Sequence, residues 1–330
     1  MKKILSAFCC TILCFGCVAA CTQKSDNIKI RVNEVTHSIF YAPFYAAIEN
    51  GYFKDEGLKI ELTNGGGADK SMTALLSDSA DIGLMGPEAA IYVYLNGKAD
   101  YPKIFAQLTK RDGSFLISRT NDQKPFDFDL MKNKEVIAGR KGGVPAMTLE
   151  YALKEKGLVN GANLTLNFDV QFALTAAAFD GGTGDYCTLF EPTASEFEKA
   201  GKGYVVASVG EFSGEVPYTA FMALDGYIKK NGDAVKKFVK ALKRGVDFTM
   251  TATDEALVNA LKKQFPSISD ESVITSIKRY RQIDAWVSKL TLNEQAFERL
   301  KNIMRSAGEL NGDALYSKMT FNDYSNEIDK

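Results

Sequence analysis

Short strand patterns alternate with short helix patterns along most of this 330-residue sequence, and this alternation limits the fold more than any other feature. Residues 28–32 and 58–62 alternate apolar and polar side chains, as strands with one buried face do. A helical pattern follows each of them, one from Pro43 to Asn50 and the other from Asp69 to Leu76. Such alternation predicts an α/β fold.

The same pattern continues through the middle of the chain and then changes. Further strands are expected at 80–85, 103–109, 135–139, 165–170, 203–209 and 218–224, and a helix at 146–156. Residues 233–307 instead read as successive helices with apolar stripes. The length suggests two domains or lobes. Because no Pro/Ser-rich linker is present, we expect the chain to cross between the lobes on strands.

The N-terminus predicts export. Two lysines precede an uncharged, mostly apolar run from Ile4 to Ala20, which is short for a membrane span and fits a secretory signal. Its end, Val18-Ala19-Ala20-Cys21, resembles a bacterial lipobox. We therefore expect a lipoprotein signal peptide at 1–20, a diacylated Cys21 and a tether at 21–27, with stable membrane anchoring by the acyl chains. The alternative is an ordinary secretory signal that happens to end near a cysteine.

Cysteine and charge counts exclude several classes of protein. Of six cysteines, four lie in the expected signal and one is Cys21, which leaves Cys187 without a disulfide partner. The single histidine, with no Cys or carboxylate cluster of suitable spacing, predicts that no metal site is present. The net charge is −1, and removing the signal with its two lysines takes it to −3. A weakly acidic chain without basic blocks is a poor candidate for nucleic-acid binding.

Several motifs together resemble a known family. A helix that ends in Gly51-Tyr52-Phe53 is followed by Glu56-Gly57-Leu58 and a strand. The other motifs are Gly65-Gly66-Gly67-Ala68, Ala80-Asp81-Ile82-Gly83, Arg111-Asp112-Gly113-Ser114, Gly139-Arg140-Lys141-Gly142-Gly143 and Phe190-Glu191-Pro192. In this order, behind a lipobox, they resemble the nitrate/taurine/alkanesulfonate/thiamine-precursor group of solute-binding lipoproteins of ABC importers. The resemblance covers nearly the whole mature chain.

The resemblance implies a two-lobed, periplasmic-binding-protein-like α/β fold with a ligand cleft between the lobes and a helical C-terminal region. Lobe one would comprise 28–115 and 220–330, and lobe two 116–219, with crossings near Ser114–Ser118 and Tyr218–Phe221. Hinge closure around a small molecule would create the form that the permease recognises. The expected partners are thus a small-molecule ligand, ABC permease subunits and, through the lipid, the membrane. We expect a monomer without a cofactor.

Candidate ligand-binding residues lie in the loops after the strands, because ligands of open α/β sheets bind beyond the carboxyl ends of strands. Glycines there let backbone N–H groups approach a ligand, tyrosines offer flat faces, and glutamates accept hydrogen bonds from ring N–H groups. The candidates are Ser38, Tyr41, Gly66, Gly86, Glu88, Ser114, Gly142, Gly143, Tyr186, Glu191 and Tyr218. Two alternatives remain: Gly65–Gly67 is only a loop, or Glu191 only caps the following helix.

The sequence favours a binding protein over an enzyme. It contains neither a phosphate-binding loop nor a nucleophile elbow. The favoured ligand is a planar nitrogen heterocycle such as a pyrimidine thiamine precursor, because the expected cleft loops carry aromatics, glycines and acids. The alternative ligand is a sulfonate or taurine-like anion. Some relatives in the resembled group synthesise a thiamine pyrimidine with a lysine-bound cofactor and a histidine, and His37 lies near the corresponding loop. A third hypothesis is a surface adhesin, but the sequence contains no repeat or low-complexity region that would support it.

Overall fold

A computed structural model describes residues 27–122 and 125–330 of the chain. The predicted signal peptide, the lipidation of Cys21 and all of the tether except Asn27 lie outside the described residues. No helix within the described ranges has the length and apolar character needed to cross a membrane.

The first lobe contains a five-stranded sheet. Its strands, in spatial order, are β2 (Leu58–Asn64), β1 (Ile28–Glu34), β3 (Ile82–Met85), β10 (Thr219–Leu224) and β4 (Pro102–Thr109). The strands β2, β1 and β3 are parallel, whereas β10 is antiparallel to both β3 and β4. Helices connect these strands: α1 (Ala42–Glu49) and α2 (Tyr52–Asp55) follow β1, α3 (Ala68–Leu76) follows β2, and α4 (Glu88–Leu95) follows β3.

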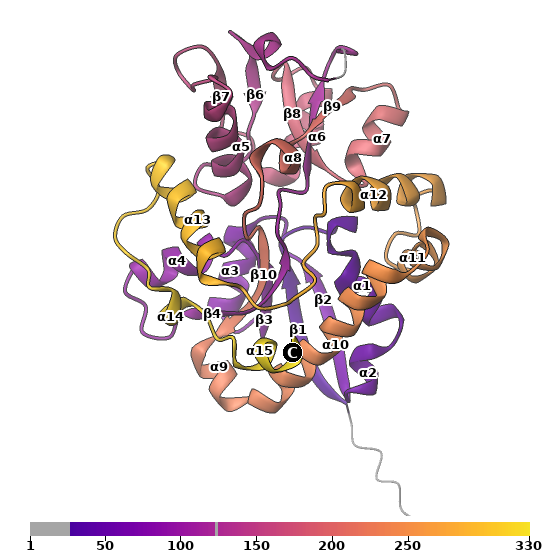
Figure 1. Cartoon of the computed structure of the whole chain (residues 1–330), viewed down its shortest axis with the longest axis vertical. Helices are drawn as coiled ribbons and strands as arrows, with labels where there is room; N and C mark the ends of the chain where they lie inside the picture. The colour runs from indigo at the N-terminus through magenta and orange to yellow at the C-terminus, as the bar shows by residue number, and fades with distance from the viewer. Residues whose placement is uncertain (1–26, 123–124) are drawn as a thin grey trace, which may run out of the picture.

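The second lobe repeats this arrangement. Its strands, in spatial order, are β7 (Thr165–Asn167), β6 (Glu135–Ile137), β8 (Tyr186–Phe190), β5 (Ser114–Ser118) and β9 (Tyr204–Ser208). Again the first three are parallel and the fourth, β5, is antiparallel to both of its neighbours. In each sheet, the antiparallel fourth position is filled by the strand that has just arrived from the other lobe. Figure 1 shows the two sheets one above the other.

The helices of the second lobe are short except for the first. They are α5 (Val144–Glu155), α6 (Thr175–Asp180), α7 (Thr193–Lys199) and α8 (Val209–Ser213), with 3₁₀ turns η2 (Phe128–Met131) and η3 (Phe172–Leu174). A 3₁₀ turn, η1 (Ile39–Tyr41), also precedes α1 in the first lobe.

Two adjacent segments carry the chain between the lobes. One is 110–113, and the other follows α8 and ends at Tyr218. The second segment hydrogen-bonds to the first and to the end of β4, because the Val216 amide donates to the Lys110 carbonyl and the Tyr218 amide to the Thr109 carbonyl. The expected crossing at Ser114–Ser118 is displaced: those residues form β5, wholly within the second sheet. The two crossings therefore lie side by side.

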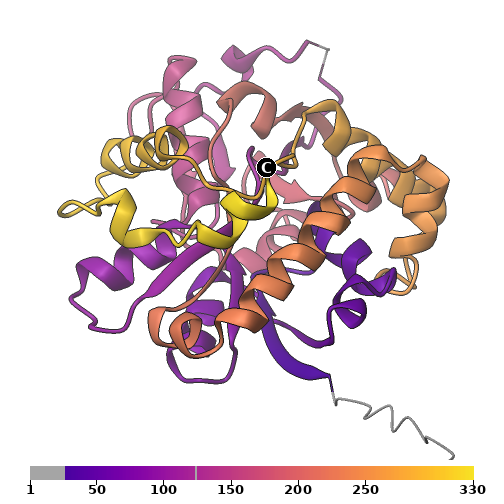
Figure 2. The same ribbon diagram turned by 60° about the horizontal axis from the view of Figure 1, so that its bottom comes forward.

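The C-terminal third is helical and covers the first lobe. Its helices are α9 (Asp225–Lys230), α10 (Gly232–Thr251), α11 (Asp254–Leu261), α12 (Asp270–Gln282), α13 (Glu294–Ser306), α14 (Tyr316–Met319) and α15 (Asp323–Ile328). The long α10 runs obliquely across the molecule and packs on α1 and α2 (Figure 2). A Cβ at Gly245 would lie 2.2 Å from the Pro43 carbonyl oxygen, so glycine permits this close approach.

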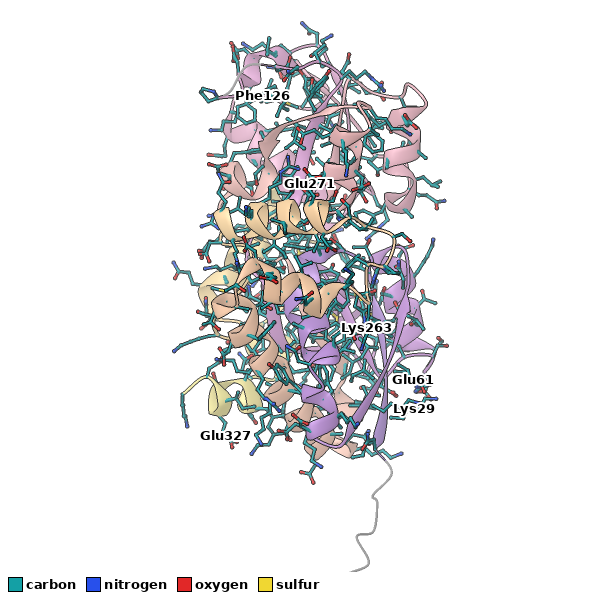
Figure 3. All side chains as sticks on the ribbon, turned by 90° about the vertical axis from the view of Figure 1, so that its right-hand side faces the viewer. Lys29, Glu61, Phe126, Lys263, Glu271 and Glu327 are labelled. Carbon is teal, nitrogen blue, oxygen red and sulfur yellow. The ribbon has the colours of Figure 1, made fainter. Side chains whose placement is uncertain are left out.

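Two of these helices also reach the second lobe. The helix α12 packs against α7 and η1, and α13 packs against α5. Figure 3 shows α12, marked by Glu271, at the waist between the lobes. One hydrophobic core extends from the first sheet through this waist to one side of the second sheet, and a smaller core around Leu116, Phe126 and Leu153 fills the other side.

Candidate ligand-binding cleft

A cleft of about 340 Å³ lies where the carboxyl ends of the parallel strands of both sheets meet. The ion pair of Lys29 and Glu61 marks the opposite end of the first sheet, away from the second lobe (Figure 3). The cleft is lined by Val35, Thr36, Tyr41, Gly66, Gly67, Ala68, Asp69, Lys70, Gly86, Glu88, Arg140, Gly143, Val144, Pro145, Phe168, Asp169, Val170, Gln171, Phe172, Phe190, Tyr218 and Thr219. Both lobes therefore contribute to one enclosed space.

Three helices begin at this cleft. The residues that precede α3, α4 and α5 are Gly67, Pro87 and Gly143, and none of them caps its helix with a side chain. The first N–H groups of a helix lack intrahelical acceptors, and the helix dipole adds partial positive charge there. The cleft therefore presents backbone donors from both lobes.

Aromatic rings form much of its wall. The rings of Phe190 and Tyr218 have centroids 6.1 Å apart, and those of Phe172 and Phe190 are 5.8 Å apart. Behind them Phe40 packs edge-on against Tyr218 at 5.8 Å. Tyr41 is buried and lines the same wall. Such flat surfaces suit a planar ligand.

Glu88 is the buried acid of the cleft. It is 1% exposed at the start of α4, and its Oε1 accepts a hydrogen bond from the Val144 N–H of α5, 3.1 Å away in the other lobe. Its Oε2 is buried without a hydrogen-bond partner among the described residues. Burial raises the pKa of Glu88 to about 7, and the Val144 N–H opposes the rise. The carboxyl group is thus poised to change charge near neutral pH.

The remaining charges of the cleft nearly cancel. Lys70 and Arg140 are the cations in its wall, and Asp69 and Asp169 are exposed acids. The Arg140 Nε lies 3.9 Å from Asp69 Oδ1 across the cleft. A simple anion would therefore meet cations that acids already partly offset.

Comparison with known proteins identifies the family. Residues 39–256 match the family described as NMT1/THI5 like. This chain belongs to the NMT1/THI5-like family. It is also 42% identical over 311 residues to the Bacillus subtilis (strain 168) protein named "Putative binding protein YtlA", covering 94% of this chain and 93% of that protein.

Solved structures share the fold of this family member. The alkanesulfonate-binding protein SsuA from Xanthomonas axonopodis pv. citri, bound to MOPS, superposes with a TM-score of 0.73 at 16% identity, covering 90% of this chain and 99% of that chain. The ligand-binding component of an ABC-type import system from Staphylococcus aureus superposes with a TM-score of 0.73 at 17% identity, covering 91% and 99%. The predicted two-lobed α/β fold and the suspected family group are confirmed.

Six of the eleven residues predicted from the sequence line the cleft of this NMT1/THI5-like protein. They are Tyr41, Gly66, Gly86, Glu88, Gly143 and Tyr218. Gly86 has a steric role, because a Cβ there would lie 2.0 Å from Glu88 Oε2. The carboxylate can fold back over the turn only if residue 86 is glycine.

Glu191 and Ser38 do not line the cleft and instead join the lobes beside it. The fully buried Glu191 carboxylate accepts hydrogen bonds from Arg279 at 2.6 Å and from the Ser195 amide of α7 at 3.0 Å. Its carbonyl accepts from Ser38 Oγ at 2.5 Å. Glu191 therefore contacts the following helix, as the capping alternative suggested, and binds α12 as well.

Ser114, Gly142 and Tyr186 also lie outside the cleft lining. Ser114 donates through its amide and hydroxyl to the buried Asp112 at the first crossing, 2.7 and 2.6 Å away. The Gly142 carbonyl accepts from the Tyr92 hydroxyl at 2.8 Å, across the lobes. Tyr186 packs on Phe126 inside the second lobe, with ring centroids 5.9 Å apart. The structure gives each of them a role in the framework around the cleft.

The sequence analysis missed the segment 168–172, Phe190 and the two cations Lys70 and Arg140. The expected strand at 165–170 ends at Asn167, so the next residues turn into the cleft. The carboxyl-end rule points to this loop once the shorter strand is known. Lys70 follows the Gly-rich turn, and the position of α3 brings it to the cleft wall.

His37 lies outside the cleft and both of its ring nitrogens are engaged. Its Nδ1 lies 2.7 Å from Glu34 Oε1 and its Nε2 lies 2.9 Å from the Gln264 carbonyl. The ring stacks on Phe265 with centroids 4.7 Å apart. His37 therefore has a structural environment. In the described parts of the chain, no group of three or more His, Cys, Asp or Glu residues is arranged to hold a metal ion.

Proposed function

We propose that this protein is the extracytoplasmic solute-binding component of an ABC importer, without catalytic activity. It captures a small organic molecule between its lobes, closes on a hinge and presents the closed form to the permease. The observation that carries this proposal is the enclosed cleft, which both lobes line and which interlobe hydrogen bonds close at its edge. Membership of the NMT1/THI5-like family and the shared fold support it.

The favoured ligand is a planar nitrogen heterocycle such as a pyrimidine thiamine precursor. Aromatic side chains would sandwich the ring, and Glu88 would accept a hydrogen bond from a ring N–H or amino group. Tyr41, Tyr218 and Phe190 supply the flat walls. The nearly balanced charge of the cleft supports a neutral or dipolar ligand over a simple anion.

A sulfonate or taurine-like anion is the second candidate. The three helix N-termini that begin at the cleft favour it, because uncapped N–H groups bind anionic oxygens. A structurally similar protein is named for binding alkanesulfonates. The acids that surround the cleft weigh against this candidate.

An enzymatic role of the kind found in pyrimidine-synthesising relatives is the least supported. Such a role would use a histidine in the first loop, and His37 is held by Glu34 and Gln264 away from the cleft. A lysine-bound cofactor would reveal itself by its visible absorbance in the purified protein.

The location of the protein is part of the same proposal. The predicted signal peptide and lipidated Cys21 would place it on the outer face of the cytoplasmic membrane, as a monomer on a short tether. Metabolic labelling with a palmitate analogue tests this, and Cys21→Ala should abolish the label.

The first experiment measures thermal unfolding of the full-length protein against aminopyrimidines, cytosine, thiamine, riboflavin, taurine, alkanesulfonates and nitrate. A ligand at a hundred times its Kd adds about 2.7 kcal/mol to the free energy of unfolding, because it binds only the folded state. We expect a shift from one chemical class, the heterocycles. A shift from alkanesulfonates alone would favour the second candidate, and no shift from any compound would contradict the proposed function.

A further inference from the structure

Glu88 differs from every other acid of the cleft because it is buried, connects the two lobes and keeps one oxygen unpaired. Asp69 and Asp169 are exposed to solvent. By contrast, Glu88 Oε1 is bonded to Val144 of the second lobe, while Oε2 has no hydrogen-bond partner among the described residues. Buried polar atoms are rarely left without a partner, so an unpaired oxygen at a ligand cleft marks a position for a ligand hydrogen.

The bond from Glu88 to Val144 exists only when the lobes are closed. Gly143 precedes α5 and has no side chain to cap it, and Pro145 has no N–H. The Val144 N–H has no acceptor within α5, and the Glu88 carboxylate from the other lobe accepts its hydrogen bond in place of a cap. Opening the hinge would break this bond and return both groups to water.

We infer that Glu88 determines which ligands close the protein: the lobes close around a solute that donates an N–H or ammonium hydrogen to Glu88 Oε2, and not around one that offers only acceptors there. This inference rests on the proposed function and deepens it. A ligand donor forms a hydrogen bond with Glu88 Oε2, while Glu88 Oε1 accepts the hydrogen bond from Val144 at the start of α5. Ligand binding and lobe closure therefore stabilise each other. An acceptor would instead face a buried negative oxygen, at a cost that closure does not offset.

Among the residues that line the cleft, Glu88 is an acid whose pKa lies near neutral pH. Arg140, from the loop before α5, favours the charged carboxylate. Tyr41 on η1, Tyr92 on α4 and Tyr218 before β10 feel the charge of Glu88, and burial raises the pKa of each hydroxyl, so they remain neutral. Asp112 beside Tyr218 is a second buried acid whose pKa burial raises to about 7.

The pH dependence of affinity therefore has a sign that reports the ligand class. A donor binds the deprotonated Glu88, whose population rises through a pKa of about 7. The affinity for a donor ligand should increase about tenfold from pH 6 to pH 8, in proportion to the competent fraction of the protein. An acceptor-only ligand should show the opposite trend. Asp112 does not line the cleft. Any pH dependence of affinity that remains after Glu88 is replaced would measure the contribution of Asp112.

The test is calorimetric titration of the full-length protein with cytosine, taurine and ethanesulfonate at pH 6 and pH 8. Cytosine offers an amino donor, taurine an ammonium group, and ethanesulfonate only acceptors, and none of them changes its main protonation state in this range. We expect cytosine or taurine to bind more tightly at pH 8. Glu88→Gln should weaken that binding at least tenfold at pH 8 and remove the pH dependence. Glu61→Gln is the matched control and should behave as the wild type, because Glu61 pairs with Lys29 at 2.7 Å at the end of the first sheet that lies away from the second lobe.

Two results would overturn the inference while leaving the proposed function intact. One is unchanged affinity and pH dependence of a bound probe in Glu88→Gln, and the other is tight binding of ethanesulfonate that strengthens toward pH 8. If none of the three probes binds, the proposed ligand class fails. Small-angle X-ray scattering of the ligand-free protein at pH 6 and pH 8 then tests whether Glu88 favours the closed form. Glu88→Ala should increase the radius of gyration relative to Glu61→Gln, and equal radii would overturn the link between Glu88 and closure.

Discussion

The two lobes meet along two seams that differ in chemistry. The pivot seam, made by Ser38, Glu191, Arg279 and Tyr280, is buried around a charge pair. Arg279 binds the fully buried Glu191 carboxylate at 2.6 Å, and the Tyr280 hydroxyl accepts from the Glu191 amide at 2.9 Å and donates to the Gly113 carbonyl at 3.1 Å. Ser38 adds its bond to the Glu191 carbonyl.

The edge seam, made by Glu88, Tyr92, Gly142 and Val144, has two hydrogen bonds between the lobes. They are Glu88 to Val144 and Tyr92 to Gly142. Breaking them on opening exposes groups that water can solvate, whereas breaking the pivot seam would strand a buried charge. From this difference we propose that the molecule opens at the edge seam and rotates about the pivot seam, next to the paired crossings.

The largest effect should come from breaking the pivot seam. Arg279→Ala leaves the Glu191 carboxylate buried without its cation, and such a loss costs about 3–5 kcal/mol of the free energy of unfolding. Urea unfolding followed by circular dichroism measures this. Arg305→Ala serves as the control, because Arg305 is half exposed and lies 3.9 Å from Asp313. If both variants lose less than about 1 kcal/mol, the pivot seam is no stronger than a surface ion pair.

An intermediate effect should come from the charge at the edge seam. Burial raises the pKa of folded Glu88 from 4.5 to about 7, so the folded protein holds this proton more tightly than the unfolded chain. The resulting stability is present below pH 4.5 and is lost as the pH rises through 7. Glu88→Gln cannot lose this proton. Its stability relative to the wild type should therefore increase by about 1–3 kcal/mol between pH 5 and pH 8.

Asp112, whose folded pKa is also about 7, is present in both proteins and cancels in this difference. Chemical unfolding at a series of pH values gives the answer. A difference that stays constant with pH would mean that Glu88 remains ionised in the closed protein.

The smallest effect should come from the second bond of the edge seam. Tyr92→Phe removes the hydroxyl that donates to the Gly142 carbonyl, which water can replace when the edge opens. We expect a cost of about 0.5–1.5 kcal/mol in closure, seen as weaker binding of the ligand from the thermal screen with little change in unfolding. Tyr94→Phe on the same helix is the control. Equal ligand affinities of the two variants would show that the Tyr92 hydroxyl does not contribute to closure.

The sequence predicts much of the fold because local patterns determine it. Period-two alternation identifies β1 and β2, and Pro43 and Gly51 mark the ends of α1 correctly. The strand β8 is missed because it lies inside the second sheet, where Cys187 and Leu189 are buried and no clear alternation remains. The crossing at β5 is expected from the family resemblance, and the five residues of this strand, all buried, carry no alternation that would correct it.

The site is predicted less completely, because neither the direction in which a side chain points nor its partners far along the chain leave a signal in the local sequence. Glu88 and Glu191 both follow a buried strand, and sequence reasoning treats them alike. Only the fold brings Arg279, from a helix far along the chain, onto Glu191 and leaves an oxygen of Glu88 unpaired. The glycines Gly66, Gly86 and Gly143 are placed correctly because loops after parallel strands converge at one edge.

The exchange of one strand between the sheets has a consequence for how the chain is assembled. All strands of the second sheet come from one continuous stretch, β5 to β9, and can pair as soon as that stretch has been made. In the first sheet, β4 pairs with β10 alone among the strands and waits for a partner on the far side of the second lobe. The lobe that begins the chain is therefore the one completed later, after the intervening stretch has brought its missing strand back.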